Sequence, residues 1–236
     1  MHLYRSIILF SYDVNNDKLT ELCRDYCLTW VYGISQFKNN LLYISDIDGN
    51  IITLEKNNHP KSDQEMFKFE RRAYFNFGER INSLESTTIK NKKLFLISSE
   101  NNKYDIINDK DTFEDKFNQS NNTEDELKVT YFGTMEGSVG IIISLNKDIF
   151  NFLNELQKLI IKKEYNYGNF NYQKWRSYKD GFDLKESKGF IEGKIIEDFL
   201  NFDETYKTNL LTELNYPWNK SFNDVINIIE ILAKSH

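Results

Sequence analysis

The chain has 236 residues, of which 40% are hydrophobic and 15% aromatic, so it is long enough for one or two folded domains. Its 36 acidic residues outnumber 30 basic ones, and the net charge of -6 excludes a chain-wide attraction to nucleic acid. Two cysteines, the absence of a secretory h-region and the absence of a ~20-residue apolar run favour a nuclear or cytosolic location over a secreted or membrane protein.

The first 107 residues are predicted to form mostly short strands. Arg5–Tyr12 is a continuous apolar run typical of a buried strand, and Asp48-Gly49-Asn50 is a strong hairpin signal. Residues 56–68 are polar and are expected to form a loop. The other expected strands are Leu19–Arg24, Thr29–Phe37, Leu41–Ile47, Ile51–Leu54, Ala73–Phe77, Ile81–Glu85, Leu94–Ser98 and Tyr104–Ile107.

A polar segment then separates these strands from one more hairpin. Residues 108–128 are almost entirely charged or amide-bearing and are predicted to be a disordered insertion. Val129–Gly133 and Val139–Leu145 follow as a hairpin whose sequence, over 131–140, parallels that of 43–52. A repeated strand–Gly–strand unit suggests propeller blades of roughly 40–50 residues. Residues 1–145 would supply about three blades, which is fewer than the 4–8 that usually close a ring.

The apolar spacing becomes helical after residue 145. Ile149, Phe152, Leu153 and Leu156 recur at helical positions and predict an amphipathic helix over 147–163. Further helices are expected at 192–202 and 203–214, and a capping box at 221–224 predicts a terminal helix. The expected fold is therefore mainly β followed by α: a partial β-propeller over residues 1–145 and a helical C-terminal domain over residues 146–236.

The helix expected at 192–202 organises its neighbourhood. It follows a turn bracketed by Gly189 and Gly193, and a polar loop joins it to the aromatic-rich anchor 175–178. A helix this short needs packing to be stable in water. The preceding sheet is the partner that we expect for it.

No residue pattern in the chain indicates catalysis, a metal or a cofactor. His2, His59 and His236 are far apart in the sequence, and no second pair accompanies Cys23 and Cys27 to complete a zinc site. The cysteines are better explained as small hydrophobic residues. The glycines at 133, 137 and 140 fit a hairpin rather than a phosphate loop, and Glu192 and Glu197 fit a helix N-terminus and a solvated helix face.

Three residues are candidates for binding a partner. Trp and Arg are favoured at the energetic centres of protein interfaces, which draws attention to Arg5, Arg24 and Trp30. The alternative is that Trp30 packs between blades and that both arginines are ordinary surface charges.

The series of short motifs along the chain resembles a known family. The motifs are Arg5–Leu9, Cys23–Tyr26 with Trp30, Gly78–Asn82, Phe132–Thr134, Trp175–Ser177, Gly189–Gly193 with Phe199-Leu200, and Ile229–His236. In this order they resemble the C-terminal end of the damaged-DNA-binding adaptors of cullin-based ubiquitin ligases. Relatives of these adaptors are the large subunit of the cleavage and polyadenylation specificity factor and the third subunit of splicing factor 3b. The last motif and the Trp-Arg-Ser block favour the adaptor.

The resemblance has several implications. It implies that 1–145 are the last blades of a third propeller and that 146–236 are helices packed beside it. It implies that Arg5, Arg24 and Trp30 lie on or near the side that faces substrate receptors. The adaptor's first two propellers, one of which binds the cullin, do not correspond to this chain, so we expect it to need further blades in cis or in trans. The alternative is an RNA-processing subunit that contributes to nucleic-acid binding by its complex. Glu192 and Lys194 depart from the family's usual aspartates.

Overall fold

The computed structural model describes residues 7–27, 29–38, 40–57, 60–98, 126–165, 168, 170–180, 183–214 and 221–235. The chain divides into two compact units, each assembled from three separate segments. We call the first the sheet unit (Met1–Ser86, Thr130–Gly140 and Gln173–Phe190) and the second the helical unit (Thr87–Val129, Ile141–Tyr172 and Ile191–His236). Both units combine segments from before and after residue 145. The predicted domain boundary at 145/146, which divides the chain at a single point, stays a prediction.

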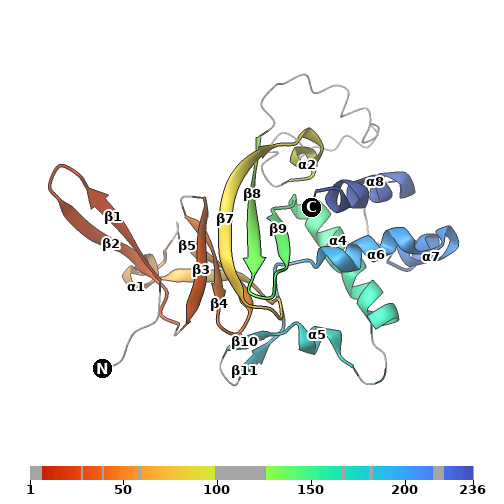
Figure 1. Cartoon of the computed structure of the whole chain (residues 1–236), viewed down its shortest axis with the longest axis horizontal. Helices are drawn as coiled ribbons and strands as arrows, with labels where there is room; N and C mark the ends of the chain where they lie inside the picture. The colour runs from red at the N-terminus through yellow and green to blue at the C-terminus, as the bar shows by residue number, and fades with distance from the viewer. Residues whose placement is uncertain are drawn as a thin grey trace. The chain divides into compact units, whose positions relative to one another are not determined.

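Two antiparallel sheets begin the sheet unit (Figure 1). The first is a hairpin of β1 (Ile8–Asp13) and β2 (Lys18–Arg24). The second joins four consecutive strands in the order of the chain: β3 (Val31–Lys38), β4 (Leu41–Asp46), β5 (Asn50–Lys56) and β6 (Phe69–Asn76). The hairpin predicted at Asp48-Gly49-Asn50 joins β4 to β5, and Gly49 adopts a left-handed φ of 77° there.

A three-stranded sheet follows, and each of its strands contributes residues to both units. Its strands are β7 (Ile81–Lys90), β8 (Glu126–Thr134) and β9 (Val139–Ile143). A further hairpin of β10 (Tyr178–Asp180) and β11 (Asp183–Lys185) lies in the stretch expected to be a polar loop. Among the strands that the structure describes, no sheet closes on itself, so the mainly β character is confirmed without a propeller ring.

Within the sheet unit, both faces of the four-stranded sheet are packed. On one face, Leu42, Ile44 and Ile52 form a core with Cys23 of β2. On the other face, the Ser45 hydroxyl donates a hydrogen bond of 2.7 Å to the Ile81 carbonyl at the start of β7. The Ser35 hydroxyl lies 2.6 Å from that of Ser86, also on β7. Because strand side chains alternate between faces, these contacts place successive sheets on opposite sides of β3–β6.

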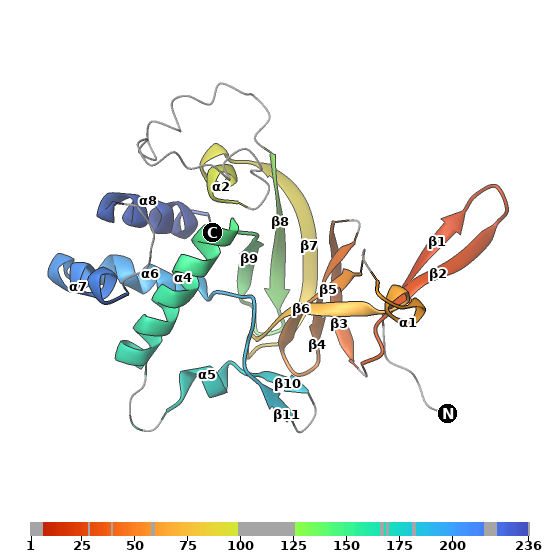
Figure 2. The same ribbon diagram turned by 180° about the vertical axis from the view of Figure 1, so that it is seen from behind.

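Helices account for most of the helical unit, where α4 (Lys147–Ile160) continues into a π-helical turn, η2 (Ile161–Tyr165). The other helices of the described residues are α1 (Asp63–Met66), α2 (Lys92–Ile97), α5 (Tyr172–Trp175), α6 (Gly193–Asn201), α7 (Glu204–Leu214) and α8 (Phe222–Ala233). The helix α6 packs on α4 and α8 (Figure 2), because its apolar stripe meets theirs. Its Ile196 also lines a cavity with Ile141 and Ile143 of β9, so the expected docking on a preceding sheet is met in part. No helix of the described ranges is long and apolar enough to cross a membrane.

Most predicted elements are confirmed, but the strand expected to be buried at Arg5–Tyr12 is β1, whose residues from Phe10 onward are exposed, and the strand expected at Leu94–Ser98 is wrong. This segment belongs to α2, because the Asn91 side chain accepts a hydrogen bond from the Leu94 amide and one helical turn buries both Leu94 and Ile97. The expected loop at 56–68 contains α1. The capping box at Ser221 and Asp224 is confirmed. The strand expected at Tyr104–Ile107 and the insertion up to residue 125 lie outside the described residues, and β8 begins at Glu126, before the insertion's expected end.

Candidate protein-binding surface

The connection between β2 and β3 presents two large aromatic side chains to solvent. Tyr26 is 61% exposed and Trp30 is 45% exposed. The Trp30 carbonyl accepts a hydrogen bond of 3.1 Å from the Ile47 amide, which fixes the backbone of Trp30 beside the end of β4. Arg24, the last residue of β2, lies at the start of this connection. We call residues 24–27 and 29–30 the aromatic loop.

A buried ion pair supports the aromatic loop from beneath. The Asp25 side chain is 2% exposed, and its Oδ2 lies 2.9 Å from Nη2 of Arg71 on β6. The Arg71 guanidinium also donates to the hydroxyls of Thr29 and Tyr178, and the Cys27 amide donates to Asp25 Oδ1. Burial alone would lower the pKa of Arg71, but the charges of Asp25, Tyr178 and Cys27 and the Asp25 hydrogen bond together outweigh that effect, and the pKa lies above its ordinary value. This network ties Asp25 and Thr29 to Arg71 of β6.

The structure places two of the three predicted partner-binding residues. Trp30 exposes nearly half of its side chain, which leaves an apolar surface at that position. Arg24 donates two hydrogen bonds, of 2.6 and 2.7 Å, to the Glu21 carboxylate on its own strand. That interaction raises the pKa of Arg24 above its ordinary value and orients the guanidinium along β2. Arg5 lies outside the described residues.

The β1–β2 hairpin extends the exposed apolar surface. Leu9 pairs with Cys23 near the base of the hairpin, and Cys23 is buried in the core of the sheet unit. Toward the tip, Tyr12 pairs with Leu19, and both side chains are more than half exposed. Phe10, between these pairs, is also exposed. Burial therefore falls along the hairpin from its base to its tip, where apolar side chains remain exposed.

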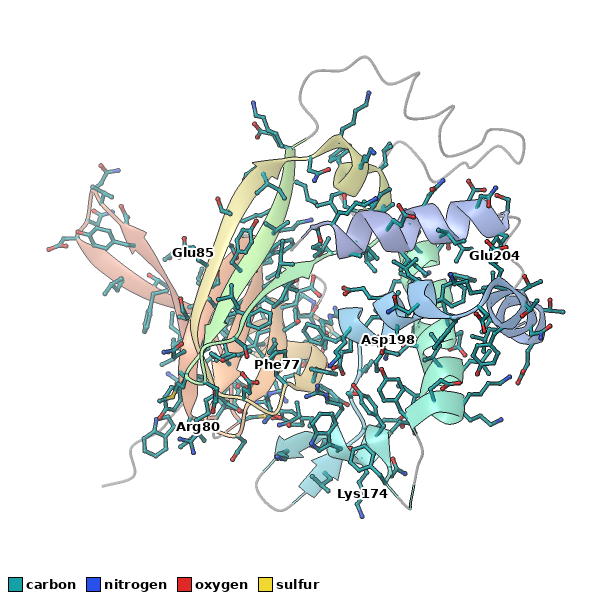
Figure 3. All side chains as sticks on the ribbon, turned by 45° about the vertical axis from the view of Figure 1, so that its right-hand side comes forward. Phe77, Arg80, Glu85, Lys174, Asp198 and Glu204 are labelled. Carbon is teal, nitrogen blue, oxygen red and sulfur yellow. The ribbon has the colours of Figure 1, made fainter. Side chains whose placement is uncertain are left out.

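The anchor segment predicted at 175–178 has a structural function in the sheet unit. Arg176 donates a hydrogen bond to the carbonyl of Phe77, a residue labelled in Figure 3. Its guanidinium lies 3.9 Å from the ring centroid of Trp175 and 5.4 Å from that of Phe75. Burial lowers the pKa of Arg176 to about 10, against the opposing charge of Glu79. Tyr178 completes the support beneath the aromatic loop, a connection that sequence spacing did not signal.

The residues considered for chemistry do not assemble into a described site. The three histidines lie outside the described residues, and within the described ranges no three His, Cys, Asp or Glu side chains gather as metal ligands. Cys23 is buried, and burial raises the pKa of its thiol. Gly137 has a φ of 96° and turns β8 toward β9, as expected for a hairpin glycine. The helical unit contains a cavity of about 130 Å³, lined mainly by Ile and Leu side chains.

Comparison with known proteins gives consistent results. Residues 2–201 match the model of the CPSF A subunit region. The chain is 25% identical over 215 residues to DNA damage-binding protein 1 of Oryza sativa subsp. japonica, which covers 91% of this chain and 17% of the relative. It is 26% identical over 199 residues to DNA damage-binding protein 1b of Arabidopsis thaliana, covering 84% and 16% respectively. It is 21% identical over 239 residues to DNA damage-binding protein 1 of Drosophila melanogaster, covering 99% and 19%. The chain thus spans less than a fifth of each of these relatives.

Proposed function

Because the chain belongs to the family defined by the CPSF A subunit region, we propose that it is a non-enzymatic scaffold segment that binds other proteins. The observation that carries this proposal is the distribution of exposed apolar side chains. Among the described residues, every exposed large hydrophobic side chain except Phe170 belongs to the sheet unit. Clusters of exposed apolar and aromatic residues are typical of protein interaction surfaces.

The aromatic loop is the proposed contact point. Its exposed Trp30 and the adjacent Arg24 are residue types that dominate binding energies at interfaces, and Arg5 belongs to the same proposed set. The buried pair of Asp25 and Arg71 supports this assignment, because a pre-ordered loop loses little entropy when it binds. By analogy with the family, the partners would be substrate receptors of a cullin ubiquitin ligase.

A second part of the proposal concerns architecture. The four-stranded meander β3–β6 has the size and connectivity of one propeller blade, and it packs between neighbouring sheets. We propose that the sheets form the last blades of a propeller whose other blades are supplied in cis or in trans. The exposed face of the β1–β2 hairpin would then be covered by those blades, because a two-stranded sheet is marginally stable alone.

The alternative function is a subunit of a nuclear splicing or polyadenylation complex. The family's name, taken from a CPSF subunit, supports it as much as the adaptor function. The relatives are named for binding damaged DNA, and in either case this segment would contribute to nucleic-acid binding through its complex. With a net charge of -6, direct binding is the weaker form of this proposal. Either function places the protein in the nucleus, with a cytoplasmic pool.

Binding to a synthetic helix taken from a cullin-ligase substrate receptor tests the first function. We expect Trp30→Ala to weaken binding of the whole chain at least tenfold, while Trp175→Ala leaves it within about twofold, since typical interface hot spots contribute 2 kcal/mol or more. Arg24→Ala should weaken binding more than Arg72→Ala, which removes another surface arginine paired with a carboxylate. If the receptor helix binds the wild-type protein and Trp30→Ala with equal affinity, the aromatic loop is not the contact point.

Co-purification distinguishes the two functions. Cullin and receptor subunits in the purified complex would support the adaptor, and splicing or cleavage factors would support the alternative. Recovery of neither class, from cells in which the protein is abundant, would count against both.

A further inference from the structure

The cavity of about 130 Å³ in the helical unit has walls from four separate elements. Ile141 and Ile143 of β9, Leu153 of α4 and Ile196 of α6 all line it. Leu153 and Ile196 are buried in the core of the helical unit. The other apolar lining residues are Leu145, Ile191 and, from α8, Leu232. The cavity is therefore a space left by the packing of the helices against β9.

Gly193, the first residue of α6, gives access to this cavity. It lines the cavity and is itself exposed, so a molecule can reach the apolar wall past it. The φ of Gly193 does not lie in the left-handed region that favours glycine. A Cβ built on Gly193 would lie 3.4 Å from Oε1 of Glu197, which is an ordinary contact. A larger side chain at position 193 would thus stand at the entrance without straining the backbone.

Two polar side chains, among the described residues that line the cavity, determine which ligands fit. Glu197, expected on a solvated helix face, is half-buried and forms part of the wall. The Ser235 hydroxyl donates a hydrogen bond of 2.6 Å to the Leu232 carbonyl, which leaves the lone pairs of its oxygen as acceptors. A carboxylate also accepts hydrogen bonds. The polar part of the wall therefore favours a ligand with a hydrogen-bond donor and disfavours a ligand carboxylate.

The volume of the cavity limits a ligand to about the size of one aromatic ring. In another protein, an apolar cavity of about 150 Å³ binds benzene. A buried water molecule needs roughly two to four polar partners, and a wall made mostly of Ile and Leu offers few of them. An apolar molecule that enters the cavity is removed from water, which is favourable.

We propose that this cavity binds a small, mainly apolar molecule, about the size of one aromatic ring, that carries one hydrogen-bond donor. Its apolar part would contact Ile143 and Ile196, and its donor would face Glu197 and Ser235. This site is separate from the proposed protein-binding surface, because the residues of the aromatic loop belong to the sheet unit. A ligand of this size is expected to bind with a dissociation constant on the order of 1 mM.

Titration of the whole chain with phenol, followed by NMR of the isoleucine methyl groups, tests the site. We expect saturable shifts at Ile143 and Ile196, while Ile52 in the core of the sheet unit keeps its position. Benzoate has the same ring with a carboxylate in place of the donor, and it should bind at least tenfold more weakly than phenol. The absence of saturable shifts at Ile143 and Ile196, or equal affinity for phenol and benzoate, would overturn the proposal.

Two leucine substitutions at neighbouring positions locate the binding site. Gly193→Leu places a side chain at the entrance and should weaken phenol binding at least tenfold. Lys194→Leu is the matched control, because Lys194 is exposed and does not line the cavity, and it should keep the affinity within about twofold. Unchanged phenol affinity in Gly193→Leu, or an equal loss in both variants, would contradict binding in this cavity.

Glu197→Gln tests the polar wall and covers the case in which Gly193→Leu does not fold. The substitution keeps the shape of the side chain but replaces a charged acceptor with a neutral amide that can also donate. It should weaken phenol binding about threefold, strengthen benzoate binding, and leave toluene, which has the ring without a donor, within about twofold. Equal changes for all three molecules would show that Glu197 does not select the ligand and would overturn the assignment of a donor-bearing ligand.

Discussion

The sheet unit and the helical unit differ in where their large apolar side chains lie. In the helical unit, residues from α2, α4, α6, α7 and α8 form one buried core, and Phe170 is its exposed large hydrophobic residue among those described. In the sheet unit, a smaller core lies against β3–β6, while aromatic side chains such as Tyr12, Tyr26 and Trp30 remain exposed. The helical unit covers its apolar surface by itself, and the sheet unit leaves much of it for another surface.

Backbone geometry explains the difference. A helix satisfies its backbone hydrogen bonds internally, so a few amphipathic helices can close around a core. A strand depends on neighbours for its backbone hydrogen bonds, and a sheet has two faces to cover. In the sheet unit, the β1–β2 hairpin has two strands and β3–β6 has four, and apolar side chains near the tip of the hairpin remain exposed.

The largest expected effect is in the helical core. Phe199 is fully buried at the centre of α6, so Phe199→Ala should lower the free energy of unfolding by about 3–5 kcal/mol. Phe170→Ala is the matched control, because Phe170 is 48% exposed, and it should cost less than about 1 kcal/mol. Urea denaturation followed by circular dichroism measures both. Similar losses in the two variants would mean that the helical unit has no single closed core.

A smaller effect is expected where the sheet unit supports its exposed loop. Arg71→Met leaves Asp25 buried without its cation and should cost about 3 kcal/mol. It should also raise the exchange rates of amides 26–30. Arg72→Met, on the same strand, removes exposed pairs with Glu55 and Glu70 and should cost at most about 1 kcal/mol. A rigid aromatic loop in Arg71→Met would show that the ion pair does not order it.

The smallest effect on stability is expected at the hairpin tip. Replacing Phe10, Tyr12 and Leu19 together with Thr removes exposed apolar side chains while keeping residues suited to a strand. We expect each of the three substitutions to contribute no more than about 0.5 kcal/mol to the change in the free energy of unfolding. Sedimentation at increasing concentration should show less self-association than in the wild type. A large loss of stability would mean that these side chains belong to the folded core, and the sheet unit would then not differ from the helical unit in leaving apolar side chains exposed.

The sequence predicted the helices better than the long-range contacts that support the sheets. The helical period of Ile149 to Ile160 and the Ser221 capping box are local signals, and both gave the correct element. Leu94–Ser98 was misjudged because a short apolar run fits a strand or one helical turn, and the Asn91 cap decides between them. The support of the aromatic loop joins Asp25, Arg71 and Tyr178 across more than 150 residues of chain, a distance over which spacing carries no information.

Site-specific photo-crosslinking tests the central claim most directly, namely that the sheet unit is the partner-binding part of this chain. A benzophenone side chain is placed at Tyr12, Tyr26 or Trp30 in the sheet unit, and at Phe170 or the exposed Lys158 in the helical unit, and the cells are irradiated. We predict that covalent adducts to other proteins form at the three sheet-unit positions and that few form at the other two. Equal adduct formation at both sets, or adducts confined to the helical unit, would contradict the account.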